Sequence, residues 1–369
     1  MNHYFMRLKA GYIILMMHLL LATLSLSYVP LFFKSQGYSL FHLILLFMLS
    51  TLGAVLFIPL MRTFSLRRFF LLSMGSYALT NLTLAFASSR YSFWLYPVFF
   101  SLNIVFFWIN LNYFFFRSST ANTNGVDSSL YMASAGLLSI FIPPLGALII
   151  NYGNYSWLFG ITAVLYLIPA YYIYHHIPDQ KSTAGFMGPL KAFKGLKTIT
   201  LAEGALGFFG GAIIPVYTIL FFPEEISFGL FLSYIGVLGL VMALVVSYRS
   251  DVSHQRMKYL FPLFILMAAS IFVFAGIGSI MGWILAVGIF SILNCISSPL
   301  RLAVSMDVKK VDLGFWKMRE FFLNVGRAVT LGISALFFYY KLFWPVFVLF
   351  GVMALAYPFL IKYKFKEMR

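Results

Sequence analysis

Ionisable side chains interrupt the apolar stretches of this 369-residue chain at three deep positions. Glu203, His18 and Arg327 each lie several residues inside a run of hydrophobic amino acids. An ionised group at the centre of such a run costs about 2.5–3.5 kcal/mol on membrane-insertion scales, so it needs a partner, a wet cavity or a function. These three residues are therefore the first candidates for chemistry.

Glu203 lies about seven residues, or roughly 10 Å, inside its run. A carboxyl at this depth could bind and release a proton, which would make it a proton-coupling site; the alternative, compatible with this, is a structural ion pair with Arg327. His18 lies at a matching depth in the first run, and imidazole titrates near neutral pH. It could relay a proton, or it could be a buried neutral side chain bonded to a backbone or hydroxyl group.

Arg327 belongs to a set of polar residues with helical spacing. Glu320, Asn324 and Arg327 fall at i, i+4 and i+7, which places them on one face of a helix. We expect this face to turn inward. Arg327 could then bind an anionic substrate, or it could balance the charge of Glu203 or Glu320.

No catalytic or metal-binding pattern stands out. His175 and His176 lack the further ligands that a zinc site needs, and no Gly-Lys phosphate loop is present. Cys295, the only cysteine, excludes an intramolecular disulfide. The sequence thus predicts neither an enzyme nor a cofactor.

The elements that must position these residues are long apolar helices. The chain is 62% hydrophobic and 10% charged, against about 45–50% and 25% in soluble domains. A membrane crossing needs about 20 apolar residues, and twelve such runs are present. The predicted spans are Gly11 to Phe33, Leu40 to Met61, Phe69 to Phe86, Trp94 to Phe116, Ser128 to Tyr152, Trp157 to Tyr174, Leu196 to Phe221, Phe228 to Val246, Tyr259 to Ile277, Met281 to Leu300, Phe321 to Tyr340 and Leu342 to Ile361. The fold class expected is an all-α membrane protein.

The formal charge of +16 is distributed unevenly between the two sides of this topology. With the N-terminus in the cytoplasm, 22 of the 26 Lys and Arg residues fall in cytoplasmic connections or termini, and only Lys34, Arg90 and Lys341 fall outside. Cytoplasmic loops of membrane proteins carry such an excess. The charge therefore predicts a multi-pass protein of the cell membrane with both termini cytoplasmic, and not a nucleic-acid partner.

Matching polar positions indicate an internal duplication. Asn110 precedes Arg117 by seven residues, and Asn294 precedes Arg301 by seven, at an offset of 184. At an offset of 185, His18 falls on Glu203. We therefore expect two six-helix halves, residues 1–178 and 196–369, joined by a cytoplasmic linker, 179–195, with a substrate site between the halves.

The chain resembles the major facilitator superfamily over essentially its whole length. The family signature between the second and third helices is G-x-x-x-D-R-x-G-R-R; Arg62 to Arg68 reads R-T-F-S-L-R-R and keeps only the paired Arg. Its counterpart in the second half keeps an acid and a base, Asp251 and Arg256. Ile142 to Ala147 reads I-P-P-L-G-A and is similar to the antiporter signature G-P-x-x-G-G, while Arg319 to Arg327 looks like a segment of many prokaryotic carriers of this superfamily.

The resemblance implies a secondary transporter and assigns further candidate residues. Asn110 and Asn294 lie on helices that line the central cavity in this family, so they could bind substrate; Asn also joins helices by hydrogen bonds. Asn324 and Arg327 are the other substrate-binding candidates. Arg117 and Arg301 fall at the inner membrane face, where snorkelling to the headgroups or a gating role could apply.

The hypothesis that follows is proton-coupled transport of a small solute by a monomer, with export of an amphipathic compound favoured over uptake of a metabolite. A lipid flippase or an accessory membrane protein on the same scaffold is the alternative. A membrane-embedded enzyme would need clustered acids and histidines at one interface, and these are missing.

Overall fold

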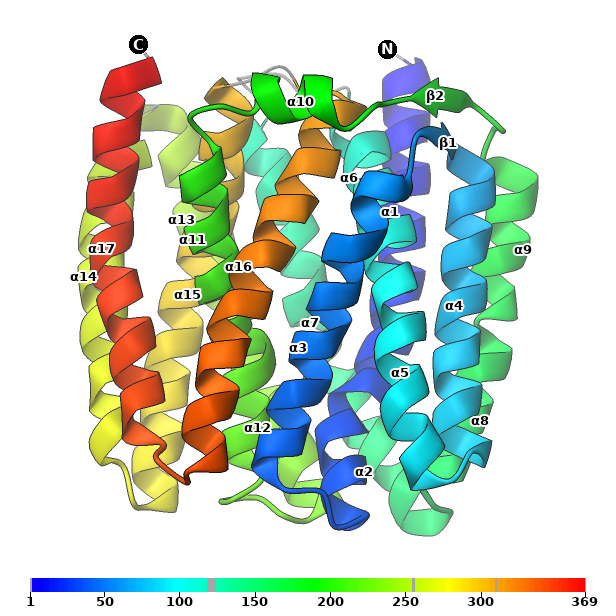
Figure 1. The fold of residues 1–369 in the computed structure, drawn as a ribbon, viewed down its shortest axis with the longest axis vertical. Helices are drawn as coiled ribbons and strands as arrows, with labels where there is room; N and C mark the ends of the chain where they lie inside the picture. The colour runs from blue at the N-terminus through cyan, green and yellow to red at the C-terminus, as the bar shows by residue number, and fades with distance from the viewer. Residues whose placement is uncertain (1, 118–123, 254–255, 309–310, 369) are drawn as a thin grey trace.

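The computed structural model is a bundle of nearly parallel helices and describes residues 2–117, 124–253, 256–308 and 311–368. Both ends of the chain lie at the same end of the bundle, where the short helix α10 (Met187–Ala192) runs across the others (Figure 1). The chain before α10 forms α1 (Asn2–Ser25), α2 (Val29–Ser35), α3 (Leu40–Phe57), α4 (Leu66–Phe86), α5 (Ser89–Asn103), α6 (Ile109–Phe116), α7 (Asn124–Tyr152), α8 (Tyr155–Leu165) and α9 (Leu167–His176). After α10 come α11 (Lys197–Phe208), α12 (Ile214–Thr218), α13 (Glu225–Ser253), α14 (Arg256–Val273), α15 (Ile280–Val308), α16 (Leu313–Tyr339) and α17 (Trp344–Met368).

Short non-α turns join several of these helices into continuous rods. Turns of 3-10 helix occupy Leu26–Tyr28, Ile58–Leu60 and Phe274–Gly276. Wider π-helical turns occupy Ile104–Trp108, between α5 and α6, and Phe209–Ile213, between α11 and α12. Such wide turns rotate the residues that follow, and they are frequent near functional sites.

The prediction of long membrane-spanning helices is confirmed. Eleven helical rods in the described part of the chain are long and apolar enough to cross a membrane. The eighth predicted span falls on α13, whose described apolar stretch, Glu225–Leu240, is shorter than a span. The expectation of an all-helical chain needs one correction, since β1 (Thr63–Ser65) and β2 (Lys181–Thr183) form a small antiparallel pair.

Two predicted helix boundaries were wrong for a common reason. The tenth span was expected to end at Leu300, but α15 continues to Val308; the eleventh was expected to begin at Phe321, but α16 begins at Leu313. Hydropathy alone assigns the charged residues in these stretches to the membrane surface. They continue the helices instead, because protein groups surround them, and the Asp312 carboxylate caps α16 by accepting a hydrogen bond from the Phe315 amide at 2.7 Å.

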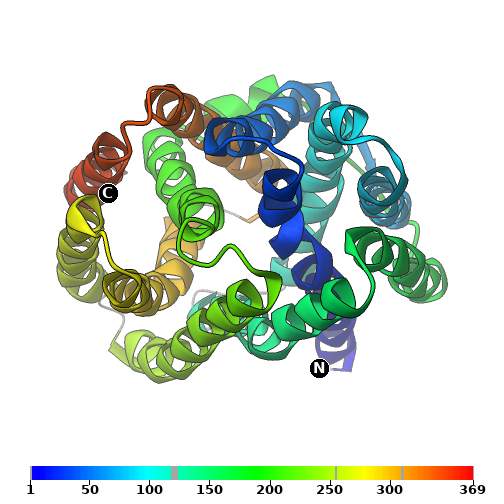
Figure 2. The same ribbon diagram turned by 90° about the horizontal axis from the view of Figure 1, so that it is seen from below.

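Helices α1–α9 gather largely on one side of the bundle and α11–α17 on the other, as seen end-on in Figure 2. The most extensive packing between the two groups joins α7 to α13 and α3 to α16. Within the second group, α16 also packs along α11. Thus α16 contacts both groups of helices, and its side chains can contribute to a site between them.

Glycines allow α11 and α16 to approach very closely. A Cβ added at Gly204 of α11 would lie 2.1 Å from the Leu323 carbonyl oxygen, and one added at Gly326 of α16 would lie 2.0 Å from the Leu201 carbonyl oxygen. Small residues permit such backbone contact between membrane helices. This crossing brings the polar faces of the two helices together.

Candidate functional site

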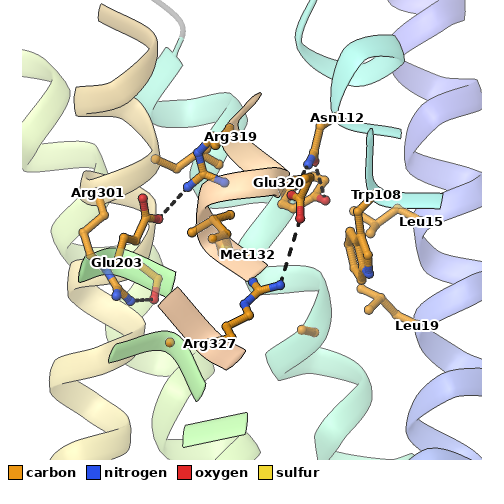
Figure 3. Close-up of a pocket in the computed structure, with 16 residues that line it drawn as sticks. Leu15, Leu19, Trp108, Asn112, Met132, Glu203, Arg301, Arg319, Glu320 and Arg327 are labelled. Carbon is orange, nitrogen blue, oxygen red and sulfur yellow. Dashed lines mark hydrogen bonds and ion pairs between the residues drawn. The ribbon is translucent and has the colours of Figure 1, made fainter. Parts of the chain in front are cut away.

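A cavity of about 250 Å³ lies among α1, α6, α7, α11, α15 and α16 (Figure 3). One part of its lining is apolar and includes Leu15, Leu19, Trp108, Met132, Leu302 and Leu323. The other part carries five ionisable side chains: Glu203, Arg301, Arg319, Glu320 and Arg327. Buried charges need partners, so the pairing of these five groups decides what the cavity can hold.

The shortest ion pair of the cavity joins α11 to α16. Arg319 Nη2 donates to Glu203 Oε1 at 2.5 Å, and the two residues are 5% and 8% exposed. The glycine crossing described above brings these two side chains within reach. The second carboxylate oxygen, Glu203 Oε2, and Arg319 Nε are buried and have no hydrogen-bond partner among the described residues.

Glu320 links α16 to the helices of the first group. Asn112 Nδ2 on α6 donates to Glu320 Oε1 at 3.3 Å, and the Tyr131 hydroxyl on α7 donates to Asn112 Oδ1 at 2.7 Å. On the other side of Glu320, Arg327 Nη1 lies 4.0 Å from Oε2 and donates to Asn324 Oδ1 at 3.2 Å. This network couples the position of α16 to that of α6 and α7.

Arg301 is held by neutral groups. Its Nη2 donates to Asn294 Oδ1 at 3.0 Å and to the Ser298 hydroxyl at 2.6 Å, and its guanidinium lies 5.9 Å from the ring centroid of Phe264. The residue is only 5% exposed. Arg301 therefore does not snorkel to the membrane surface; it lines the cavity.

The structure corrects two expectations about charge. Glu203 pairs with Arg319 and not with Arg327, whose nearest carboxylate is that of Glu320. Glu203 and Arg327 are also not the single deep acid and cation, since Glu320, Arg301 and Arg319 share the same cavity. Hydropathy predicts that Arg319 lies outside the eleventh span, because it does not detect a charge whose partner lies inside the protein.

Asn110 and Asn294 were expected to face one central cavity, and the structure does not bring them together there. Asn110 is buried, donates to the Phe106 carbonyl oxygen of its own helix at 2.8 Å, and lines a separate small pocket. Asn112 occupies the cavity instead, two residues later and beyond the π-helical turn Ile104–Trp108 that rotates this segment. Asn294 reaches the cavity only through its hydrogen bond to Arg301. Asn324 supports Arg327 in the same way.

His18 is enclosed by aromatic rings outside the cavity lining. The centroids of Phe107 and Tyr77 lie 3.9 and 4.3 Å from that of the imidazole, with Trp108 and Tyr166 further out. Neither ring nitrogen has a hydrogen-bond partner among the described residues. Its position thus offers no direct path for a proton to Glu203.

Arg117 lies at the end of α6, away from the cavity. Its Nη1 donates to Gln180 Oε1 at 3.0 Å, and its guanidinium lies 5.2 Å from the ring centroid of Phe114. Asp251, the remaining predicted charge, belongs to α13, and its side chain lies outside what the structure describes. Arg117 does not contribute to the cavity lining.

The linker interacts through Asp179 with the loop between α3 and α4 and with the start of α4. The Ser65 hydroxyl donates to Asp179 Oδ1, and Arg68 Nε and Arg67 Nη2 lie 3.5 and 4.0 Å from Asp179 Oδ2. The Ser65 hydrogen bond and the neighbouring cations keep the pKa of Asp179 below its usual range. The carboxylate missing from the R-T-F-S-L-R-R loop is therefore supplied by the linker.

Lys317 holds the same end of the bundle together. Its ammonium group donates to the carbonyl oxygens of Met61 and, at 3.1 and 3.4 Å, of Ala184 and Gly185. Beside it, the rings of Phe116 and Trp316 stack with centroids 5.3 Å apart. These contacts join α16 to the loop before α4, to the linker and to α6.

Comparison with known proteins identifies the class of this chain. The model of the Major Facilitator Superfamily matches residues 11–314, and the chain belongs to this family of membrane transporters. The crystal structure of the human organic anion transporter MFSD10 (TETRAN) has the same fold, with a TM-score of 0.69 and 13% sequence identity over 96% of this chain and 98% of that one. A comparison with curated protein sequences found no match.

We predict that the Glu203–Arg319 pair is energetically coupled. Glu203→Gln or Arg319→Gln alone leaves one buried charge uncompensated, which costs about 3–5 kcal/mol of unfolding free energy. The double variant should lose less than the sum of the two, and denaturant unfolding of the detergent-purified protein, followed by tryptophan fluorescence, measures this. Asp179→Asn is the control, because the ion pairs of Asp179 with Arg67 and Arg68 are partly exposed to solvent and should contribute little. Additive losses at Glu203 and Arg319 would contradict the coupling.

Proposed function

We propose that this chain is a secondary carrier that moves a small amphipathic solute across a cell membrane by alternating access. The cavity carries this proposal, because its lining comes both from helices before the linker and from helices after it. Its apolar part suits a hydrophobic body and its charged part suits a polar group. The proposed carrier is a monomer.

The proposed topology has twelve crossings in two six-helix halves, residues 1–178 and 196–369, with the linker 179–195 in the cytoplasm. In this arrangement α13 is the eighth crossing. The two termini lie at the same end of the bundle, which supports an even number of crossings (Figure 1). α13 would therefore add one crossing to the eleven candidate spans. The basic residues gathered at that end support a cytoplasmic assignment.

Proton coupling is proposed to act through the carboxylates of the cavity. Glu203 keeps one buried oxygen without a partner, and Glu320 lies 4.0 Å from its nearest cation. Glu320 replaces His18 as the second candidate, since the aromatic enclosure of His18 separates it from the cavity. Export is favoured over uptake because Ile142 to Ala147 of α7 is similar to the antiporter signature.

Labelling of single cysteines tests the topology. In a Cys295→Ser background, Lys191→Cys on α10 and Glu224→Cys at the opposite end of the bundle are both exposed. We expect a membrane-impermeant maleimide to label position 224 in intact cells and position 191 only after the membrane is opened. Labelling of both positions from the same side would overturn the topology.

Replacement of Glu203 tests the transport mechanism. A counterflow screen of a solute library in proteoliposomes first finds a transported compound; movement of a lipid reporter alone would favour the flippase instead. Glu203→Gln cannot release a proton, so we expect accumulation driven by a pH gradient to fall at least tenfold while downhill exchange survives. Surviving exchange also demonstrates a folded protein.

Glu203→Asp serves as the matched control because it keeps the carboxyl group and should retain part of the gradient-driven accumulation. If Glu203→Gln still accumulates the solute with unchanged pH dependence, Glu203 is only a structural partner of Arg319. The same measurement on Glu320→Gln then decides whether the other carboxylate couples the proton.

A further inference from the structure

The charged side chains around the cavity do not balance. Three guanidinium groups, on Arg301, Arg319 and Arg327, face two carboxylates, on Glu203 and Glu320. With both carboxylates ionised, the lining carries one excess positive charge. A buried charge without an opposite partner is costly, so the cavity lacks one negative charge.

The unbalanced cation is Arg301. Glu203 is bonded to Arg319, and Glu320 lies closest to Arg327. No carboxylate of a described residue lies within 4.0 Å of Arg301, whose hydrogen bonds go to a neutral amide and a neutral hydroxyl. Its Nε is buried and has no hydrogen-bond partner among the described residues.

The surroundings of Arg301 indicate what kind of anion would fit. A guanidinium presents paired N–H donors that match the two oxygens of a carboxylate. Figure 3 shows Arg301 on one side of the cavity and Leu15, Leu19 and Trp108 on the other, so an apolar body attached to the carboxylate would meet an apolar wall. The excess of a single charge favours a monoanion over a dianion such as a phosphate monoester.

We propose that the cavity binds a small monocarboxylate with an apolar or aromatic body, whose carboxylate is held by Arg301. The claim that this monocarboxylate is the transported solute rests on the proposed carrier function. The claim that the cavity binds it does not. Asn294 and Ser298 are positioning residues, because their hydrogen bonds orient the guanidinium. None of the residues expected from the sequence to bind substrate is the anchor in this arrangement.

Binding of matched acids and amides tests the proposal. The probes are benzoate and 2-naphthoate, with benzamide and 2-naphthamide as uncharged counterparts of the same shape. Dissociation constants are measured by isothermal titration on the detergent-purified full chain. We expect each carboxylate to bind at least tenfold more tightly than its amide, and Arg301→Gln to abolish this preference. Arg301→Lys should keep part of it, and Lys34→Gln, at an exposed cation in the last turn of α2, should leave it unchanged.

Several outcomes would overturn the anion site: equal binding of acid and amide, no binding of either carboxylate, or an unchanged preference in Arg301→Gln. If Arg301→Gln does not fold, the comparison of Arg301→Lys with the unaltered protein decides. Titration needs no gradient, so carboxylate binding without transport contradicts only the carrier function. Counterflow of a neutral solute without carboxylate binding contradicts only the anion site.

Discussion

The arrangement depends on one constraint: five ionisable side chains share a cavity of about 250 Å³ inside a bundle of apolar helices. Such groups remain charged there only if each finds an opposite charge or strong hydrogen bonds. The closest pair, Glu203 with Arg319, requires α11 and α16 to touch backbone to backbone, which Gly204 and Gly326 permit. The same helix crossing therefore provides both the close packing of α11 on α16 and the ion pair between them.

α16 connects this charge network to the rest of the molecule. Through Glu320 and Asn112 it is bonded to α6, through Lys317 it is bonded to the loop before α4 and to the linker, and along its length it packs on α3. A change of charge at Glu203 or Glu320 therefore acts on contacts between the two groups of helices. In the proposed carrier, that connection would link protonation to a change of access.

The sequence predicted the helical membrane fold and a deeply placed carboxyl at Glu203, because long apolar runs and an acid within one of them can be read from the amino-acid sequence. It did not predict Arg319 as the partner of Glu203, since hydropathy places charges such as Arg319 and Lys317 at the membrane surface when protein groups surround them. It also named Asn110 where Asn112 lines the cavity, because the match to Asn294 across the internal repeat indicates the helix but not which side of that helix turns inward. The partner of a charged side chain and the direction in which a helix face turns depend on tertiary packing, whereas the depth of a residue in an apolar run can be read from the sequence.

Distances between spin labels at the two ends of the bundle test the central claim most directly. In a Cys295→Ser background, the exposed pair His176→Cys and Lys362→Cys reports one end, and Arg90→Cys and Leu342→Cys report the other. Alternating access around the charged cavity predicts two distance populations at each end, changing in opposite directions, with proportions that shift with pH and in Glu320→Gln. A single distance distribution at both ends, unchanged by pH or by Glu320→Gln, would contradict the account.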